Sequence, residues 1–101
     1  QIVLIADPLT ADEALRLGLV NQVVEPEALL PAAEQLARRI AANGPLAVRK
    51  AKEAMVRSSG RPLEEAFAVE SECAREVWRS EDAKEGPRAF LEKRPPRFTG
   101  R

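Results

Sequence analysis

Signals for helix ends and helix starts divide much of the chain into short helices, and this feature restricts the fold more than any other. Gly44 ends one segment and Pro45 begins the next, because glycine suits the left-handed position after a helix and proline suits the first turn. Pro62 begins a third segment. Ser80, followed by two acidic residues, caps a fourth. The sequence therefore predicts consecutive helices joined by tight connections.

Each of these segments carries apolar residues at helical spacing, which predicts one buried face per helix. The first three stripes are Leu29, Ala33, Leu36, Ala37, Ile40 and Ala41; Ala47, Val48, Ala51, Ala54 and Met55; and Leu63, Ala66, Phe67, Ala74, Val77 and Trp78. Gly86 and Pro87 fall in the middle of the fourth helix, where proline removes a backbone hydrogen bond. We expect a mainly α fold, with a helical domain over residues 28–101.

Residues 1–27 have a different character. The run IVLIA, residues 2–6, is too short to be assigned to a strand or to the last turn of a buried helix. Thr10 and Glu13 have the spacing of a capping box, and Gly18 stands where a left-handed residue ends a helix, so a short helix is predicted over 10–17. The β-branched residues of 19–24 predict one short strand whose partner lies outside this sequence.

Charge and composition exclude several classes of function. Sixteen basic and sixteen acidic residues give a formal net charge of zero, so no overall field favours nucleic acid or an anionic membrane. With one cysteine and no histidine, neither a disulfide nor a metal site is expected. The single cysteine favours a reducing, cytoplasmic setting, and no apolar run is long enough to span a bilayer, so a soluble protein is expected. Because the chain opens on Gln1 without an initiator methionine, we expect it to be part of a longer protein.

No residue of the chain is a strong candidate for catalysis. Adjacent carboxylates occur where first-turn acids stabilise helix N-termini. Glu70 lies on an apolar stripe, which predicts an ion pair with an arginine across a helix or subunit contact, or else a functional carboxyl. Cys73 lacks a histidine to activate it and is expected to be a buried thiol. Trp78 is expected in the core or in a subunit interface, with a ligand platform as the alternative.

The stretch AFLEKRPPRF, residues 89–98, combines an aromatic ring with basic side chains. If a helix runs through Phe90 and Lys93, a spacing of three residues places the ring and the ammonium on one face. Such a pair can bind a ligand. It can equally be one packing residue beside an ordinary surface lysine, and the residues alone leave both interpretations open.

Three stretches carry a family resemblance. PLTADEALRLGLVNQVV, LARRIAANGPLAVRKAKEAM and SEDAKEGPRAFLEKRPPRFTGR resemble the C-terminal part of the enoyl-CoA hydratase/isomerase, or crotonase, family. The resemblance implies that a spiral of ββα units, absent here, supplies the catalytic acids and an oxyanion hole of two backbone N–H groups. Residues 1–27 would be the tail of that spiral domain. Ala6 departs from the family pattern, because many relatives carry glycine there.

What the resemblance implies about function is equally specific. The helical domain would pack into trimers, often paired as hexamers, and help to cover the acyl-CoA site of an enzyme of fatty acid or acyl-CoA degradation. Phe90 and Lys93 match positions that contact the adenine nucleotide of CoA, which is part of the substrate; no prosthetic group is implied. The expected reaction is hydration of 2-enoyl-CoA. Other reactions of the family, such as isomerisation, hydrolysis or decarboxylation, and a helical assembly module without ligand stay open.

Overall fold

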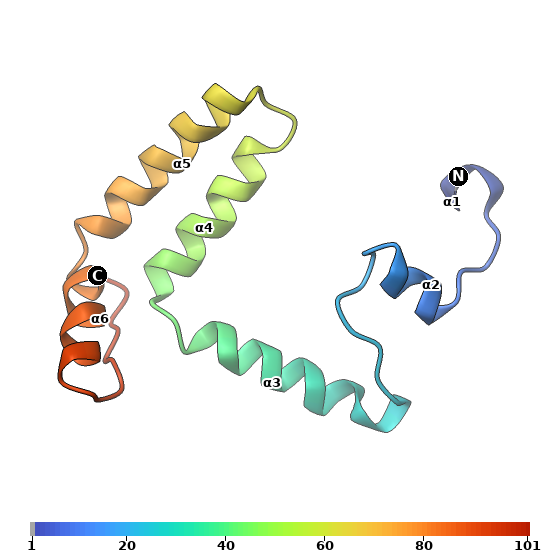
Figure 1. Cartoon of the computed structure of the whole chain (residues 1–101), viewed down its shortest axis with the longest axis horizontal. Coiled ribbons are helices and arrows are strands. Elements are labelled where there is room, and N and C mark those ends of the chain that lie inside the picture. The colour runs from blue at the N-terminus through green and yellow to red at the C-terminus, as the bar shows by residue number, and fades with distance from the viewer. Residues whose placement is uncertain (1) are drawn as a thin grey trace. The chain divides into compact units, whose positions relative to one another are not determined.

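The computed structural model describes residues 2–101 (Figure 1), and within this range the chain divides into two compact units after Leu36. The elements in chain order are α1 (Ile2–Ile5), α2 (Ala11–Arg16), the 3-10 turn η1 (Pro26–Ala28), α3 (Leu29–Ala41), α4 (Pro45–Ser58), α5 (Leu63–Trp78) and α6 (Glu81–Leu91). The prediction of a mainly α chain is confirmed. The predicted division into residues 1–27 and 28–101 stays a prediction.

The first unit confirms the predicted capping box. The Thr10 hydroxyl accepts a hydrogen bond from the Glu13 amide, and the Glu13 carboxylate accepts one from the Thr10 amide at 3.0 Å. The helix α2 ends in a Schellman motif, in which Gly18 has a φ of +74°. The Gly18 amide donates to the Leu15 carbonyl, and the Leu19 amide donates to the Ala14 carbonyl. Glycine reaches this left-handed conformation without strain.

The predicted strand over 19–24 is wrong, because no strand occurs within residues 2–101. A strand exists only when its backbone groups pair with a second strand, and side-chain preference cannot replace that partner. The run 2–6, for which the sequence leaves both a strand and a helical turn open, contains the helix α1, and none of the residues of α1 is buried. Ala6, which follows it, has a φ of +59°, a conformation that favours glycine.

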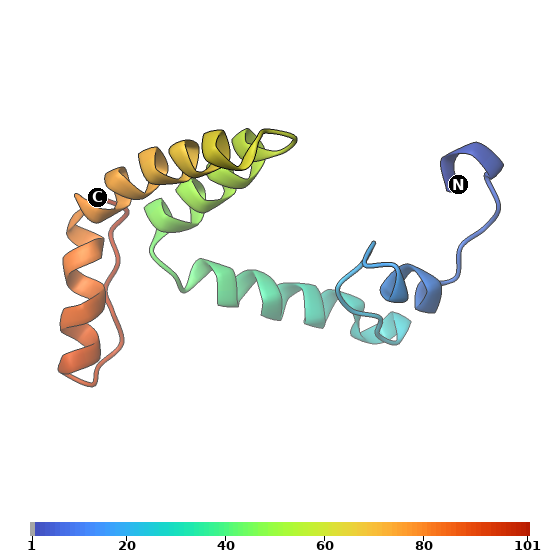
Figure 2. The same ribbon diagram turned by 45° about the horizontal axis from the view of Figure 1, so that its top comes forward.

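In the second unit, α4 and α5 lie side by side as an antiparallel hairpin (Figures 1 and 2). Val69 and Cys73 are its buried apolar residues, which confirms the prediction of a buried thiol. Two cross-helix ion pairs border the packing, Lys50 with Glu76 at 2.8 Å and Arg57 with Glu72 at 2.8 Å. The hairpin is thus joined by a small apolar contact and by charged pairs at its margin.

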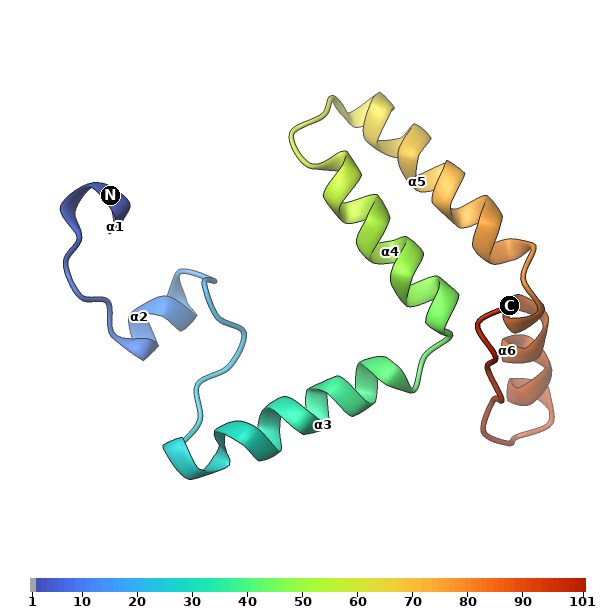
Figure 3. The ribbon, with the colours of Figure 1, turned by 180° about the vertical axis from the view of Figure 1, so that it is seen from behind.

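The helix α6 continues through Pro87 and ends at Leu91, four residues before Pro95 and Pro96, at which the sequence predicts its end. Its N-terminus is capped by the Ser80 hydroxyl, which accepts a hydrogen bond from the Ala83 amide. Gly86 precedes the proline, and its lack of a Cβ removes part of the clash that normally keeps the preceding residue out of a helix. After α6 the chain reverses, and residues 94–101, here called the tail, run back beside the helix (Figure 3).

The tail ends near the N-termini of both α4 and α6. The backbone amide of Asp82, in the first turn of α6, donates to the Arg101 carbonyl at 3.1 Å. The Phe98 ring lies against the backbone at Gly44 and Gly86. A Cβ atom at Gly44 would lie 3.7 Å from the ring atom nearest to it, and a Cβ atom at Gly86 would lie 3.8 Å from the ring atom nearest to it. The tail therefore connects the two ends of α6 and reaches the start of α4.

Candidate functional site

The end of α6 holds the two residues that the sequence singles out for ligand binding. Phe90 lies in the last turn of the helix, and its side chain is 83% exposed, whereas its neighbour Ala89 is 1% exposed. The helix thus buries Ala89 and turns the Phe90 ring outward. The ring is not part of the core of the described chain, so it is available for contact with a ligand or another protein surface.

Lys93 does not lie in the helix, and the premise that a single helix face carries Phe90 and Lys93 is wrong. The helix ends at Leu91, and Lys93 takes the left-handed position of a Schellman motif with a φ of +52°. Its amide donates to the Phe90 carbonyl at 3.2 Å, and the Arg94 amide donates to the Ala89 carbonyl at 3.1 Å. Two backbone hydrogen bonds therefore tie the lysine to the turn that carries the ring.

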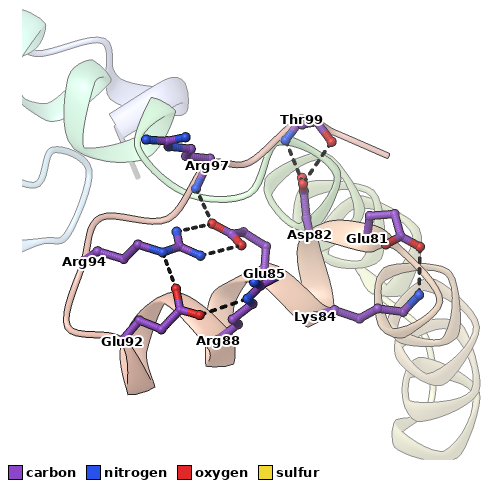
Figure 4. A pocket seen from close by; sticks show the side chains of 9 residues that line it. All are labelled: Glu81, Asp82, Lys84, Glu85, Arg88, Glu92, Arg94, Arg97 and Thr99. Atoms are coloured by element: carbon purple, nitrogen blue, oxygen red, sulfur yellow. Dashed lines mark hydrogen bonds and ion pairs between the residues drawn. The ribbon is translucent and has the colours of Figure 1, made fainter.

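A carboxylate on α6 holds the tail immediately after this turn (Figure 4). Both Glu85 oxygens accept hydrogen bonds from the Arg94 guanidinium, at 2.6 and 3.0 Å, and one oxygen also accepts from the Arg97 amide at 2.8 Å. Such bidentate pairs are strong and directional. The Arg94 guanidinium, followed by the Arg97 amide, lowers the pKa of Glu85 to about 2. Glu92 accepts from the same Arg94 side chain and from Arg88.

A second carboxylate, Asp82, holds the distal part of the tail. It is only 7% exposed and accepts hydrogen bonds from the Thr99 and Gly100 amides, each at 2.7 Å, and from the Thr99 hydroxyl. The Thr99 amide is the main cause that lowers the pKa of Asp82. Asp82 and Glu85 are three residues apart, so one face of α6 presents both carboxylates to the tail. We call Asp82, Glu85 and Arg94 the tail clamp.

Sequence reasoning missed the tail clamp. Asp82 was expected only to stabilise the first turn of α6, and Glu85 carried no prediction. The partners of these carboxylates are nine or more residues away, beyond the reach of helical spacing rules. The only signal in the sequence is the density of basic residues and prolines after α6, which the structure resolves into a tail docked on the helix.

Two other predictions from the sequence are corrected in part. Glu70 is exposed and forms no ion pair within residues 2–101, so a pair within the chain is wrong and a pair across a subunit contact stays a prediction. Trp78 is 75% exposed, which excludes the core of this chain and leaves an interface or a ligand platform. Both line an apolar groove on the α4–α5 hairpin, together with residues that include Met55, Leu63 and Phe67.

Residues 2–101 contain neither a group of potential metal ligands nor a helix that could span a membrane. Within residues 2–101, no three histidine, cysteine, aspartate or glutamate side chains are grouped so as to hold a metal ion. None of the helices in the same range combines the length and the apolar character that crossing a membrane requires.

Solved structures of other proteins resemble this helical chain closely. An enoyl-CoA hydratase from Mycobacterium marinum superimposes with a TM-score of 0.90 and 48% sequence identity, over 97% of this chain and 39% of that one. An enoyl-CoA hydratase/isomerase from Mycobacterium paratuberculosis gives a TM-score of 0.90 at 40% identity, over 95% and 38%. The fold is thus that of the C-terminal helical part of crotonase-like proteins.

The sequence comparisons give the family. Residues 1–101 match the enoyl-CoA hydratase/isomerase family, and the chain belongs to it. It is 44% identical to the short-chain-enoyl-CoA hydratase of Clostridium acetobutylicum over 93% of this chain, and 43% identical to the crotonyl-CoA hydratase of Syntrophomonas wolfei over 97%. The chain spans 36% and 38% of the length of these two relatives.

Proposed function

We propose that the whole protein hydrates 2-enoyl-CoA thioesters and that Phe90 and Lys93 bind the adenine nucleotide of CoA. The observation that carries the binding proposal is the exposed Phe90 ring beside a lysine fixed in a left-handed turn. An aromatic face suits a purine, and an ammonium suits a phosphate. The names of the relatives support hydration as the reaction and a CoA thioester as the substrate.

Within this proposal the chain contributes binding and assembly, and the chemistry takes place elsewhere. Groups outside these residues polarise the thioester carbonyl in an oxyanion hole and add water across the α,β double bond. Phe90 and Lys93 hold the nucleotide, far from the reacting acyl group. Because such contacts stabilise the bound substrate and the transition state equally, they act on KM and leave kcat unchanged.

The assembly part of the proposal rests on apolar surface. Leu63, Phe67 and Trp78 are largely exposed on one groove of the α4–α5 hairpin, and a monomer seldom leaves such a patch open to water. We assign this surface to contacts with the rest of the protein and with neighbouring subunits in a trimer or a dimer of trimers. Sedimentation of the whole protein tests the assembly, and a monomer at micromolar concentration contradicts it.

The binding proposal is tested with two substrates in the whole protein. Lys93→Gly removes the ammonium and keeps the left-handed turn, and Phe90→Ala removes the ring. With crotonyl-CoA, both variants should raise KM about fivefold, the equivalent of about 1 kcal/mol for a partly exposed contact. With the crotonyl thioester of pantetheine, which lacks adenine and the nucleotide phosphates, both variants should match the wild type. Equal losses on the two substrates would refute nucleotide binding by these residues.

A further inference from the structure

The conformation of Lys93 calls for an explanation that the turn itself does not supply. The chain closes two helices with the same Schellman motif, α2 at Gly18 and α6 at Lys93. At Gly18, glycine takes the left-handed position at no steric cost. At Lys93, a residue with a Cβ takes it with a φ of +52°. Residues strained in this way persist where their surroundings hold them, and they concentrate at functional sites.

The residues on both sides of Lys93 are held. Glu92 ends the helix, and its carboxylate accepts hydrogen bonds from both Arg88 and Arg94. On the other side, the Arg94 guanidinium is fixed by both oxygens of Glu85. Figure 4 shows the Arg94 guanidinium between α6 and the tail, next to the carboxylates of Glu85 and Glu92. The pairs of Arg94 with Glu85 and Glu92 thus lie on both sides of the lysine in the chain.

The same contacts leave the Lys93 ammonium free. Two carboxylates, Glu85 and Glu92, lie close to the turn in sequence and would attract a nearby cation. Both are occupied by Arg94, and Glu92 also by Arg88. Lys93 accordingly forms no ion pair within residues 2–101. Arg94 therefore restrains the backbone of the lysine and also keeps acidic competitors away from its side chain.

We propose that Glu85 and Arg94 are positioning residues that fix Lys93 in the left-handed turn and direct its ammonium to a phosphate of CoA. This inference rests on the proposed binding role of Lys93. Fixing the backbone from which a flexible side chain extends removes part of the entropy that is lost on binding. Loss of Arg94 releases the turn and leaves Glu85 and Glu92 open to pair with Lys93, whereas loss of Glu85 releases the turn by leaving Arg94 with Glu92 alone.

The test uses Arg94→Gln and Glu85→Gln in the whole protein, with Arg97→Gln as the matched control. Arg97 lies in the same tail, and only its backbone amide contacts Glu85, while its guanidinium points away (Figure 4). We expect KM for crotonyl-CoA to rise about twofold to tenfold in both clamp variants, the range that ordering one long side chain implies. We expect kcat, the pantetheine thioester kinetics and the Arg97→Gln enzyme to be unchanged.

A double variant separates positioning from a structural role. In the Lys93→Gly background, Arg94→Gln should raise KM no further, because the ammonium is gone and glycine adopts the turn without help. A full additional rise in that background overturns the inference, as does a loss of kcat with the pantetheine substrate. If Lys93→Gly raises KM and neither clamp variant does, the inference fails and the proposed function stands. If Lys93→Gly has no effect on KM, the proposed binding of the nucleotide by Lys93 fails, and the positioning role fails with it.

Amide hydrogen exchange provides a readout independent of activity. The Lys93 and Arg94 amides donate the two hydrogen bonds of the turn, so their exchange reports its opening. Exchange at these two amides should accelerate in Arg94→Gln and in Glu85→Gln, and it should match the wild type in Arg97→Gln. Unchanged exchange in both clamp variants would show that the turn holds Lys93 without the clamp, which overturns the inference.

Discussion

Replacing Lys93 by glycine is expected to stabilise the protein, although it removes a whole side chain. With a φ of +52°, the lysine lies in the left-handed region, where a residue with a Cβ is disfavoured by roughly 1–2 kcal/mol. Glycine avoids that cost, but its greater freedom in the unfolded chain offsets about 0.5–1 kcal/mol. Because Lys93 forms no ion pair within residues 2–101 that the change would remove, the net gain should be about 0.5–1 kcal/mol.

Thermal unfolding of the whole protein measures this gain, with Lys93→Ala as the control. Alanine also removes the ammonium, but it keeps the Cβ and therefore the strain. For a chain of about 150–250 residues, 1 kcal/mol shifts the Tm by about 2–4 °C. The glycine variant should melt about 1–4 °C above the wild type, and the alanine variant should not. If the two variants melt at the same temperature, the left-handed turn at Lys93 is not a source of strain.

Three further outcomes are expected. The Arg94 guanidinium lowers the pKa of Glu85 from 4.5 to about 2, so this pair stabilises the fold fully above about pH 4.5 and is lost as the pH falls toward 2. The Tm difference between the wild type and Glu85→Gln should shrink over that range; a constant difference contradicts the charge argument. Ala6→Gly should raise the Tm, since Ala6 has a φ of +59°, and a lower Tm speaks against strain there. Residues 1–101 expressed alone should associate or unfold in part, because Val3 and Leu4 are exposed; sedimentation as a monomer that resists dilution would contradict this.

Features that depend on a few neighbouring residues could be predicted from the sequence. The capping box at Thr10 and Glu13, the glycine that closes α2 and the proline that starts α4 all act over at most five residues. The Ser80 cap belongs to the same class. In each case one side chain or one φ angle decides the local structure, so the residue type is sufficient to identify the helix boundary.

Burial could not be predicted in the same way. The prediction of one buried face per helix is wrong for the described residues. The helices α3 and α4 have no buried residue, and the buried residues of α5, Val69 and Cys73, lie outside its predicted stripe, whereas Trp78 is exposed. Periodicity predicts which side of a helix is apolar. It does not predict which other part of the protein covers that side. The strand predicted over 19–24 failed for a related reason, because its preference required a partner that residues 2–101 do not provide.

The tail clamp was beyond prediction for another reason, since it joins residues that no local rule connects. Thr99 and Gly100 bind Asp82 through their backbone amides, and backbone amides carry no sequence signal. The left-handed conformation of Lys93 was equally hidden, because the usual marker of that conformation is glycine. The pair of Glu85 and Arg94, by which we propose to explain a lysine in its place, is visible only in the structure.

The comparison of Gly18 with Lys93 leads to a test in which two measurements move in opposite directions. If closing the helix were the only requirement at position 93, glycine would serve better than lysine, as it does at position 18. A lysine that occupies this position despite strain should therefore contribute something that the turn does not need. Under our proposal that contribution is an ammonium for a CoA phosphate, so Lys93→Gly should raise the Tm and also raise KM for crotonyl-CoA. A residue with a purely structural role lowers both stability and activity when it is replaced, or changes neither. A Tm that rises without any change in KM would leave the strain at Lys93 without a function and would remove the basis for nucleotide binding at this turn.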